Sequence, residues 1–494
     1  MRGKTQEYRD GMIALTPEGQ KSVVDSPLYN EDLRPVPIKE RTWTAYNIAA
    51  LWIGMSVCIP TYMLASGLIA AGMNWWQALL TIILGNVIVL IPMILNAHAG
   101  TKYGIPYPVF ARLSFGTKGA HVPAILRAIV AAGWFGIQTW IGGAGVQALV
   151  SAMIPGWSNF TLGPVVSFLA FWALNVYIGY KGPEAIKFME SWGSPILIVM
   201  GLALLIWAYL AAGGLGPIVS QPDKFETTAD FMKVFLPSLT GMIAFWATLA
   251  LNIPDFSRFA VNQRAQMLGQ ALGLPTTMGF YAFIGVIVTS ATVVVYGEAI
   301  WDPVVLMTKF PPLVVLIGTV GIVLATITTN IAANVVAPAI GISNLFPKKI
   351  TFGMGTIITG LIGIAMCPWY LLANYGNYIF GWLGTYGGFL GPLAGIYICD
   401  YWIIRRQRID LDDLYREEGK YAYGGSGVNW KAIIALVVGV LFALIGKIVP
   451  ALGWLYANAW MVGALVGGVV YYFLMRNDST ILTEEYFRSI TDGL

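Results

Sequence analysis

The sequence predicts an all-α polytopic membrane protein that crosses the bilayer twelve times. Hydrophobic residues make up 57% of the 494 residues and charged residues only 11%, whereas about 25% of a soluble domain is charged. Apolar runs recur along the chain, and about 20 apolar residues are enough for a helix to cross the hydrocarbon core. The alternating segments that would build a membrane β-barrel do not occur in the sequence.

The predicted spans follow one another from residue 45 to residue 475. Their bounds are 45–71, 74–97, 122–153, 160–180, 188–212, 234–254, 270–297, 312–343, 352–371, 376–402, 431–449 and 456–475. They divide the chain into an N-terminal segment (1–43), a ten-helix transport core (44–402), a loop (403–430), two extra helices (431–475) and a tail (476–494).

The basic residues orient the chain. Twelve spans place both termini on one side, and that side carries 24 of the 29 Lys and Arg residues, against 4 on the other, with Arg127 inside the third span. An excess of basic residues marks the cytoplasmic side. The chain is therefore predicted to be a multi-pass protein of the cell membrane with both termini in the cytoplasm. Arg405, Arg406 and Arg408 after the tenth span are expected to be solvated residues beside lipid headgroups.

The first span contains a stretch where a continuous helix is hard to maintain. Gly54 and Pro60 bracket it, and proline removes one backbone donor and clashes with the carbonyl four residues earlier. This pattern indicates either a simple kink or a broken helix. A broken helix exposes carbonyl oxygens that bind ions and substrates in transporters. The segment alone leaves both possibilities open.

The third and sixth spans carry aromatic and amide side chains in mid-membrane. Trp134 and Gln138 are four residues apart and share a helix face. An indole can stack on a flat heterocycle, and an amide both donates and accepts hydrogen bonds. Trp246 is a candidate for a second aromatic face. Ordinary packing between helices is the alternative for all three residues. Asp255, near the membrane boundary, is predicted to be a helix-end or gating residue.

The eighth span contains the densest uncharged polar patch in the chain. Three threonines and two asparagines lie between residues 326 and 334, which is more than one helix interface needs. Hydroxyl and carbonyl oxygens suit a small alkali cation, and the amide of Asn334 suits a substrate. Proton-coupled carriers commonly use a buried carboxylate or histidine. These segments have no central acidic residue, so sodium is favoured over the proton.

The sequence argues against an enzyme and against a channel. It has no HExxH or GxSxG motif, no carboxylate pair within a span and no repeated filter sequence. Cys58, Cys367 and Cys399 have no metal-binding spacing. No cofactor is expected apart from the coupling ion. The expected partners are a small heterocyclic substrate, sodium or a proton, and membrane lipid, with no nucleic acid.

Several segments resemble a known transporter family. The match runs from residues 30–35 (NEDLRP) to 410–415 (DLDDLY), and its most specific parts are 100–108 (GTKYGIPYP), 134–139 (WFGIQT), 252–258 (NIPDFSR) and 391–395 (GPLAG). The chain resembles the nucleobase–cation symporter family one, whose members carry hydantoins, allantoin, uracil, cytosine and related compounds. It is particularly similar to the allantoin permeases.

The resemblance implies a fold and a site. The fold would be a five-plus-five inverted repeat of the LeuT-like kind plus two C-terminal helices, with broken first and sixth spans. Trp134 and Trp246 would form the aromatic walls around the substrate, with Gln138 and Asn334 as amide partners. The backbone at Phe245 and the side chain of Cys58 would also face it. The implied sodium ligands are the carbonyls of Gly54, Val57 and Ala325 and the hydroxyls of Thr328 and Thr329.

Two departures from the family affect the substrate. Cys58 stands where the hydantoin and allantoin branches usually have an amide, and a thiol is a weaker hydrogen-bonding group. Phe245 stands where the hydantoin branch has a smaller residue. Uracil therefore becomes comparable to allantoin as a candidate.

The predicted function is sodium-coupled symport of such a heterocycle or ureide by alternating access. The glycine-rich half of span ten from Gly381 to Gly391 would occlude the site. The alternatives are proton-coupled uptake of cytosine or another small ring, and an amino-acid-type carrier of the same fold.

Overall fold

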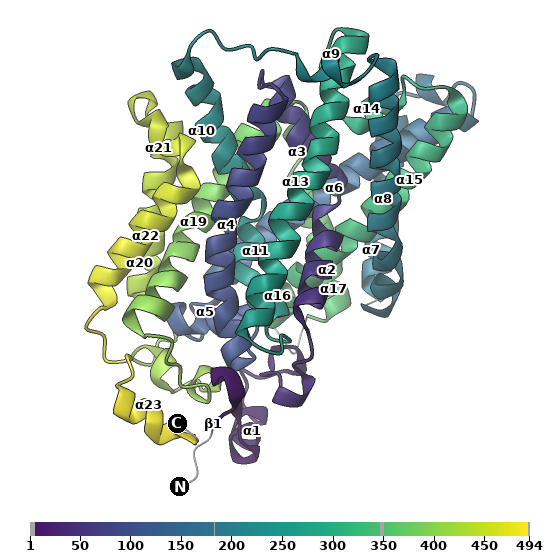
Figure 1. The fold of residues 1–494 in the computed structure, drawn as a ribbon. Helices are drawn as coiled ribbons and strands as arrows, with labels where there is room; N and C mark the ends of the chain where they lie inside the picture. The colour runs from purple at the N-terminus through teal and green to yellow at the C-terminus, as the bar shows by residue number, and fades with distance from the viewer. Residues whose placement is uncertain (1–4, 182, 346–349, 493–494) are drawn as a thin grey trace.

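The computed structural model describes residues 5–181, 183–345 and 350–492, and its long helices form one bundle (Figure 1). The bundle elements are α2 (Ala45–Ser56), α3 (Ile59–Ala70), α4 (Trp75–Tyr103), α6 (His121–Met153), α7 (Gly163–Lys181), α8 (Pro183–Ala211), α10 (Thr228–Phe245), α11 (Ala247–Asn252), α13 (Gln263–Tyr296), α15 (Pro312–Asn334), α16 (Val336–Leu345), α17 (Phe352–Ala365), α19 (Gly384–Ile398), α20 (Trp430–Leu444), α21 (Gly453–Ala457) and α22 (Ala459–Met475). Two π-helical segments flank α19, η5 (Gly376–Leu383) before it and η6 (Cys399–Ile404) after it.

Short elements connect and cap the bundle. The short helices are α1 (Pro17–Val24), α5 (Tyr107–Phe115), α9 (Leu215–Val219), α12 (Pro254–Ser257), α14 (Pro303–Met307), α18 (Pro368–Leu371) and α23 (Glu484–Ile490), and the strands are β1 (Thr5–Glu7), β2 (Ile13–Leu15) and β3 (Thr491–Asp492). The 3₁₀ turns are η1 (Arg9–Gly11), η2 (Glu31–Leu33), η3 (Ile38–Glu40), η4 (Trp157–Asn159), η7 (Asp413–Tyr415), η8 (Lys420–Ala422), η9 (Ile445–Lys447) and η10 (Pro450–Leu452).

The helical bundle confirms the predicted fold class. Within the described residues, seven helices are long and apolar enough to cross a membrane, or nine if each of two bent pairs counts as one span. Each of the twelve predicted spans coincides with a helix or a group of successive helices. Some are short, since α17 has only 14 residues. The number of twelve crossings therefore stays a prediction.

Close helix contacts hold the bundle together. The helix α13 packs against α2, α3 and α4, whereas α15 packs against α6 and α8. The helix α22 packs along α19, where a Cβ at Gly395 would overlap the carbonyl oxygen of Ala464. Small residues at such contacts let helix backbones approach closely in membranes.

Both chain termini lie at the same end of the bundle, called here the terminal end (Figure 1). A three-stranded sheet of order β2-β1-β3 joins them there, with β1 antiparallel to β2 and parallel to β3. This sheet was not predicted from the sequence, because strands of two or three residues leave no detectable period. It ties the N-terminal segment to the tail.

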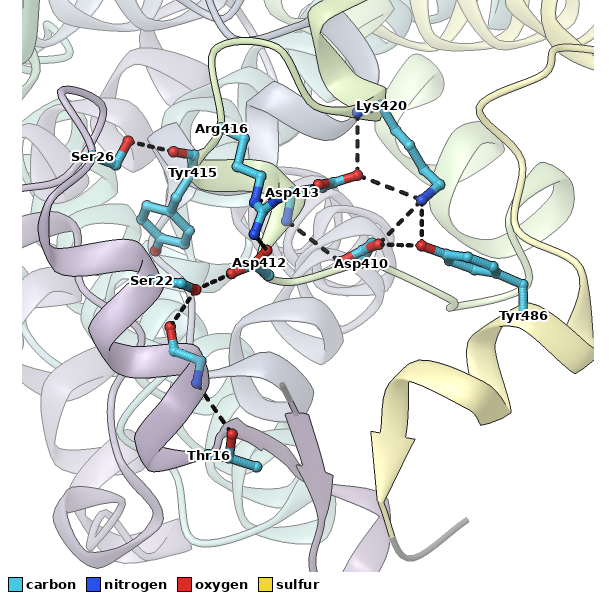
Figure 2. Close-up of polar contacts among 11 residues, drawn as sticks. Thr16, Ser22, Ser26, Asp410, Asp412, Asp413, Tyr415, Arg416, Lys420 and Tyr486 are labelled. Carbon is cyan, nitrogen blue, oxygen red and sulfur yellow. Dashed lines mark hydrogen bonds and ion pairs between the residues drawn. The ribbon is translucent and has the colours of Figure 1, made fainter. Parts of the chain in front are cut away.

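The loop after span ten connects the two terminal segments through polar contacts (Figure 2). From α1, Ser22 donates a hydrogen bond to Asp412 of this loop. Lys420 lies 3.3 Å from Asp410 Oδ2 and donates to the Tyr486 hydroxyl of α23 at 2.6 Å. The loop therefore lies between α1 and α23 and contacts both.

The expectation that Arg405 is solvated was wrong. Its side chain is fully buried, and Nε lies 2.9 Å from Asp400 Oδ1. The guanidinium also donates to the carbonyl of Thr480 at 3.0 Å and to the hydroxyl of Tyr423 at 2.9 Å. The π-helical turn η6, with its bond from the Arg405 amide to the Asp400 carbonyl, turns this residue inward.

Candidate functional site

The first span is a broken helix. The axes of α2 and α3 differ by 60°, and the two residues between them, Val57 and Cys58, have non-helical backbone angles. Pro60 occupies the first turn of α3, where its missing donor costs little. The structure therefore confirms a break rather than a simple kink. Gly54 lies in the last turn of α2, and the Val57 carbonyl lies just beyond that helix.

The sixth span is interrupted at a single residue between α10 and α11, without a bend as large as that of the first span. Trp246 separates the two helices, with φ −104° and ψ 7°. Its side chain is buried, and within the described residues its indole nitrogen has no hydrogen-bond partner. The edge of Trp52 packs against this indole with 5.1 Å between ring centroids. An unpaired indole N–H thus lies at the break.

The predicted aromatic residues converge around Phe245. Its ring centroid lies 5.1 Å from that of Trp134 and 5.0 Å from that of Trp246, and both contacts are edge-to-face. Phe245 therefore lies between the two tryptophans and keeps their rings from facing each other directly. The sequence-based prediction placed the backbone of this residue at the substrate and noted its large side chain as a departure from the family, and the structure shows that this side chain contacts both tryptophans.

Three aromatic residues of span ten also contact Trp134, namely Tyr378, Trp382 and Tyr386, and the sequence did not reveal the role of the last two. The Tyr386 hydroxyl accepts a hydrogen bond from Trp134 Nε1 at 3.3 Å and donates one to the Ala244 carbonyl at 2.8 Å. The Trp382 ring lies 6.4 Å from Trp134. Both come from η5 and α19 within the predicted occluding segment. Their aromatic character was visible in the sequence. The side of the helix on which they lie depends on the π-helical turn of η5, which the sequence did not indicate.

Polar groups of α6 and α15 meet beside this cluster. The hydroxyl of Thr329 lies 2.9 Å from Gln138 Oε1 and 3.0 Å from the Ala325 carbonyl oxygen. The Thr328 hydroxyl donates to the same carbonyl at 2.8 Å. The structure therefore brings the three predicted ion ligands of α15 together and connects them to Gln138. The helix α15 also packs against α2, which carries Gly54.

Asn334 and Cys58 lie in separate parts of the site. Asn334 donates to Asn330 Oδ1 at 3.0 Å, and Asn330 donates to the Thr139 hydroxyl of α6 at 3.2 Å. Asn334 is thus joined to α6 through Asn330 rather than through Gln138. The Cys58 sulfur lies 3.3 Å from the Thr61 hydroxyl. Asn330 was noted in the polar patch, but its bridging position could not be derived without the helix packing.

The comparisons with known proteins decide the family. Residues 35–463 match the family described as "Permease for cytosine/purines, uracil, thiamine, allantoin". The chain belongs to this permease family. It is accordingly a multi-pass membrane transporter, in a family of transporters rather than enzymes.

Two relatives and one solved structure show how far the similarity extends. An allantoin permease of Bacillus subtilis (strain 168) is 43% identical over 91% of this chain and 93% of its own length. The purine-uracil permease NCS1 of Arabidopsis thaliana is 42% identical over 92% of this chain and 79% of its own length. The nucleobase-cation-symport-1 family transporter Mhp1, solved in a closed conformation with bromovinylhydantoin bound, has a TM-score of 0.75 at 27% identity, over 91% of this chain and 95% of that chain.

Proposed function

We propose that this permease is a secondary active transporter that carries a nucleobase-like heterocycle or ureide together with sodium. Candidate substrates are allantoin, uracil and a hydantoin. The observation that carries the proposal is the placement of Trp134 and Gln138 on one face of α6, opposite the break at Trp246. The named relatives transport or bind compounds of this chemical class.

The chemistry of the proposed substrate site suits a neutral ring. Trp134, Phe245 and Trp246 offer aromatic surfaces, while Gln138 and Asn334 offer amides. None of these side chains carries a formal charge, so a neutral heterocycle brings no unpaired charge into the membrane. Because Phe245 lies between the two indoles, a ring can stack against Trp134 and Trp246 only if the phenyl ring turns aside. The size of Phe245 thus favours a compact substrate.

The proposed sodium site lies where α2 ends against α15. Its ligands would be the carbonyls of Gly54, Val57 and Ala325 with the hydroxyls of Thr328 and Thr329. The short distances from both hydroxyls to the Ala325 carbonyl support this assignment, because they gather three oxygens of α15 in one place. Carbonyl and hydroxyl oxygens are hard ligands, as an alkali cation requires.

Thr329 offers a physical link between ion and substrate. Its hydroxyl has one hydrogen, which either the Gln138 amide oxygen or the Ala325 carbonyl can accept. A cation bound to that carbonyl and to the hydroxyl oxygen would repel the hydrogen towards Gln138. The amide of Gln138 would then be fixed with its NH₂ group directed away from Thr329. Sodium would in this way tighten substrate binding.

The terminal end of the bundle is proposed to face the cytoplasm. The excess of basic residues on the side of the termini supports this orientation. The protein would lie in the cell membrane and bind substrate from outside. In alternating access, sodium must favour one conformation to shift the equilibrium. The broken first and sixth spans are the elements whose halves can move separately.

Substrate binding to the purified protein tests the proposal. Tryptophan fluorescence is titrated with uracil, allantoin and a substituted hydantoin, each with and without sodium. The expected result is quenching by at least one compound, with a lower Kd in sodium. A Thr329→Val protein should keep the quenching and lose the sodium effect. A Thr326→Val protein, altered at a buried threonine with no assigned ion role, should keep both.

Three outcomes would change the proposal. Quenching that sodium does not affect, but that depends on pH, would favour proton coupling. No response to any of the three compounds, with folding confirmed, would direct the search to cytosine and then to amino acids. Unchanged sodium dependence in Thr329→Val would refute the assigned ion site.

A further inference from the structure

Arg127 is a buried cation without a close partner. It lies near the start of α6 and is only 4% exposed. Within the described residues, its Nε has no hydrogen-bond partner, and no ion pair reaches the side chain. A buried, unpaired charge is costly, and removing it from a core often stabilises a protein. An ionisable group inside a membrane span is accordingly a candidate for a functional role.

Arg127 shares a helix face with the proposed substrate residues. Trp134 follows it by seven residues and Gln138 by eleven, so with 3.6 residues per turn all three lie along one stripe of α6. A rise of 1.5 Å per residue places Arg127 about 10 Å from Trp134 along the helix, towards the terminal end. It therefore lies between the proposed substrate residues and the terminal end of the bundle.

Asn252 presents an unpaired acceptor in the same region. It ends α11, the inner half of the broken sixth span, which packs against α6. Asn252 is fully buried, and its Oδ1 has no hydrogen-bond partner among the described residues. Its Nδ2 donates to Asp255 Oδ2 at 3.2 Å, which fixes the orientation of the amide. The free oxygen is therefore an acceptor.

Asp255 connects the two unpaired groups. Its carboxylate acts electrostatically on Arg127. Among the described residues it forms no ion pair with Arg127, and it accepts hydrogen bonds from the Tyr107 amide at Oδ1 (2.8 Å) and from Asn252 at Oδ2. Asp255 thus balances the charge of Arg127 from a distance. A donor on α6 and an acceptor on α11 remain without partners beside one carboxylate.

We propose that Arg127 and Asn252 form a second binding site for the transported heterocycle, on the inner side of the break at Trp246. Arg127 would donate to a ring carbonyl, and Asn252 Oδ1 would accept from a ring N–H. Lactam, imide and ureide groups present these two functions next to each other. The ring would make both contacts while it exchanges with the cytoplasm, and not while it is bound at the proposed substrate site beside Trp134 and Gln138. This inference rests on the proposed function, since it assumes that such a ring is transported.

Transport measured from each side of the membrane tests this site. Right-side-out and inside-out vesicles containing the full-length protein are assayed for uptake of radiolabelled uracil or allantoin, whichever the wild type transports. In Arg127→Gln, the KM in inside-out vesicles should rise about tenfold, since a hydrogen bond to a charged group is lost. The KM in right-side-out vesicles should stay within twofold of wild type. Arg264→Gln, which removes an exposed arginine at the terminal end, should change neither KM.

A second variant separates binding from a structural role. Asn252→Leu should also raise the KM only in inside-out vesicles. A substrate analogue methylated at the ring nitrogen that Asn252 contacts has no N–H to donate to Asn252. In inside-out vesicles, Asn252→Leu and the wild type should therefore have the same KM for this analogue. Equal KM values for wild type and Arg127→Gln on both faces would overturn the second site. So would an equal rise on both faces, which would indicate a structural effect. A wild type that transports none of the candidate rings would instead overturn the proposed function.

Discussion

Substituting Tyr386 by phenylalanine should weaken substrate binding about fivefold without changing its dependence on sodium. The Tyr386 hydroxyl accepts from Trp134 Nε1 at 3.3 Å and donates to the Ala244 carbonyl at 2.8 Å. It thereby connects the indole of α6 to the last turn of α10. In Tyr386→Phe, the buried Trp134 N–H loses the hydrogen-bond partner that the structure gives it, and the indole is no longer fixed in one orientation.

The magnitude follows from the geometry of that bond. A buried donor without a partner costs about 1–3 kcal/mol. The bond to Trp134 is long, so the lower end applies, and about 1 kcal/mol corresponds to roughly a fivefold change in Kd. The assay is equilibrium binding of a radiolabelled substrate to the purified protein, because the substitution alters tryptophan fluorescence directly.

Tyr397→Phe is the matched control for this experiment. Tyr397 lies on the same helix, and its hydroxyl donates to the Tyr107 hydroxyl at 3.3 Å, away from the proposed substrate residues. This variant should bind with the Kd of wild type. Our assignment of Tyr386 would be refuted if Tyr386→Phe also bound like wild type, or if both variants lost affinity equally.

Three further predictions concern stability and are measured by thermal unfolding in detergent. Asp400→Asn should lower the unfolding free energy by about 3–5 kcal/mol, because it leaves the buried Arg405 guanidinium without a counter-charge. Gly395→Ala should lower the melting temperature, because its Cβ would push α19 away from α22. Burial and the nearby Asp413 raise the pKa of Asp410 above 3.8. The folded state therefore binds this proton more tightly than the unfolded state. Stability should then fall as the pH rises from about 4 through the raised pKa, and Asp410→Asn should reduce that fall.

The first two of these predictions have controls in the same chain. Glu484→Gln alters the ion pairs that exposed Glu484 makes with Arg408 and Arg488 and should leave the unfolding free energy close to that of wild type, because solvent screens such pairs. Gly453→Ala places its Cβ in open space and should leave the melting temperature unchanged. A loss in Asp400→Asn no larger than in Glu484→Gln would contradict the importance of the buried pair. For Asp410→Asn, the contradicting result is a pH profile identical to that of wild type.

The sequence carried much of the information about the bundle and its broken helices. Each apolar run is a local feature, and so is the helix break that Gly54 and Pro60 favour. The four-residue spacing of Trp134 and Gln138 likewise depends only on helix geometry. The positions of the predicted spans could therefore be read before any packing was known.

Other features depend on contacts between distant segments and could not be read from the sequence. Tyr386 contacts Trp134 from α19, directly after the π-helical segment η5, and Phe245 contacts two indoles at the point where α10 ends, one residue before Trp246. Arg405 likewise turns towards Asp400 directly after the π-helical segment η6. The pairing of β1 with β3 joins residues almost five hundred positions apart, which no local pattern can indicate.

Accumulation of substrate in proteoliposomes tests sodium-coupled symport most directly. The purified protein is reconstituted, and uptake of the radiolabelled heterocycle is followed under an inward sodium gradient, a choline gradient of the same size, or a proton gradient without sodium. Sodium-coupled symport predicts transient accumulation above the external concentration with the sodium gradient alone, and its loss in Thr329→Val. Equal accumulation with the proton gradient in the absence of sodium would contradict sodium coupling and the proposed ion site.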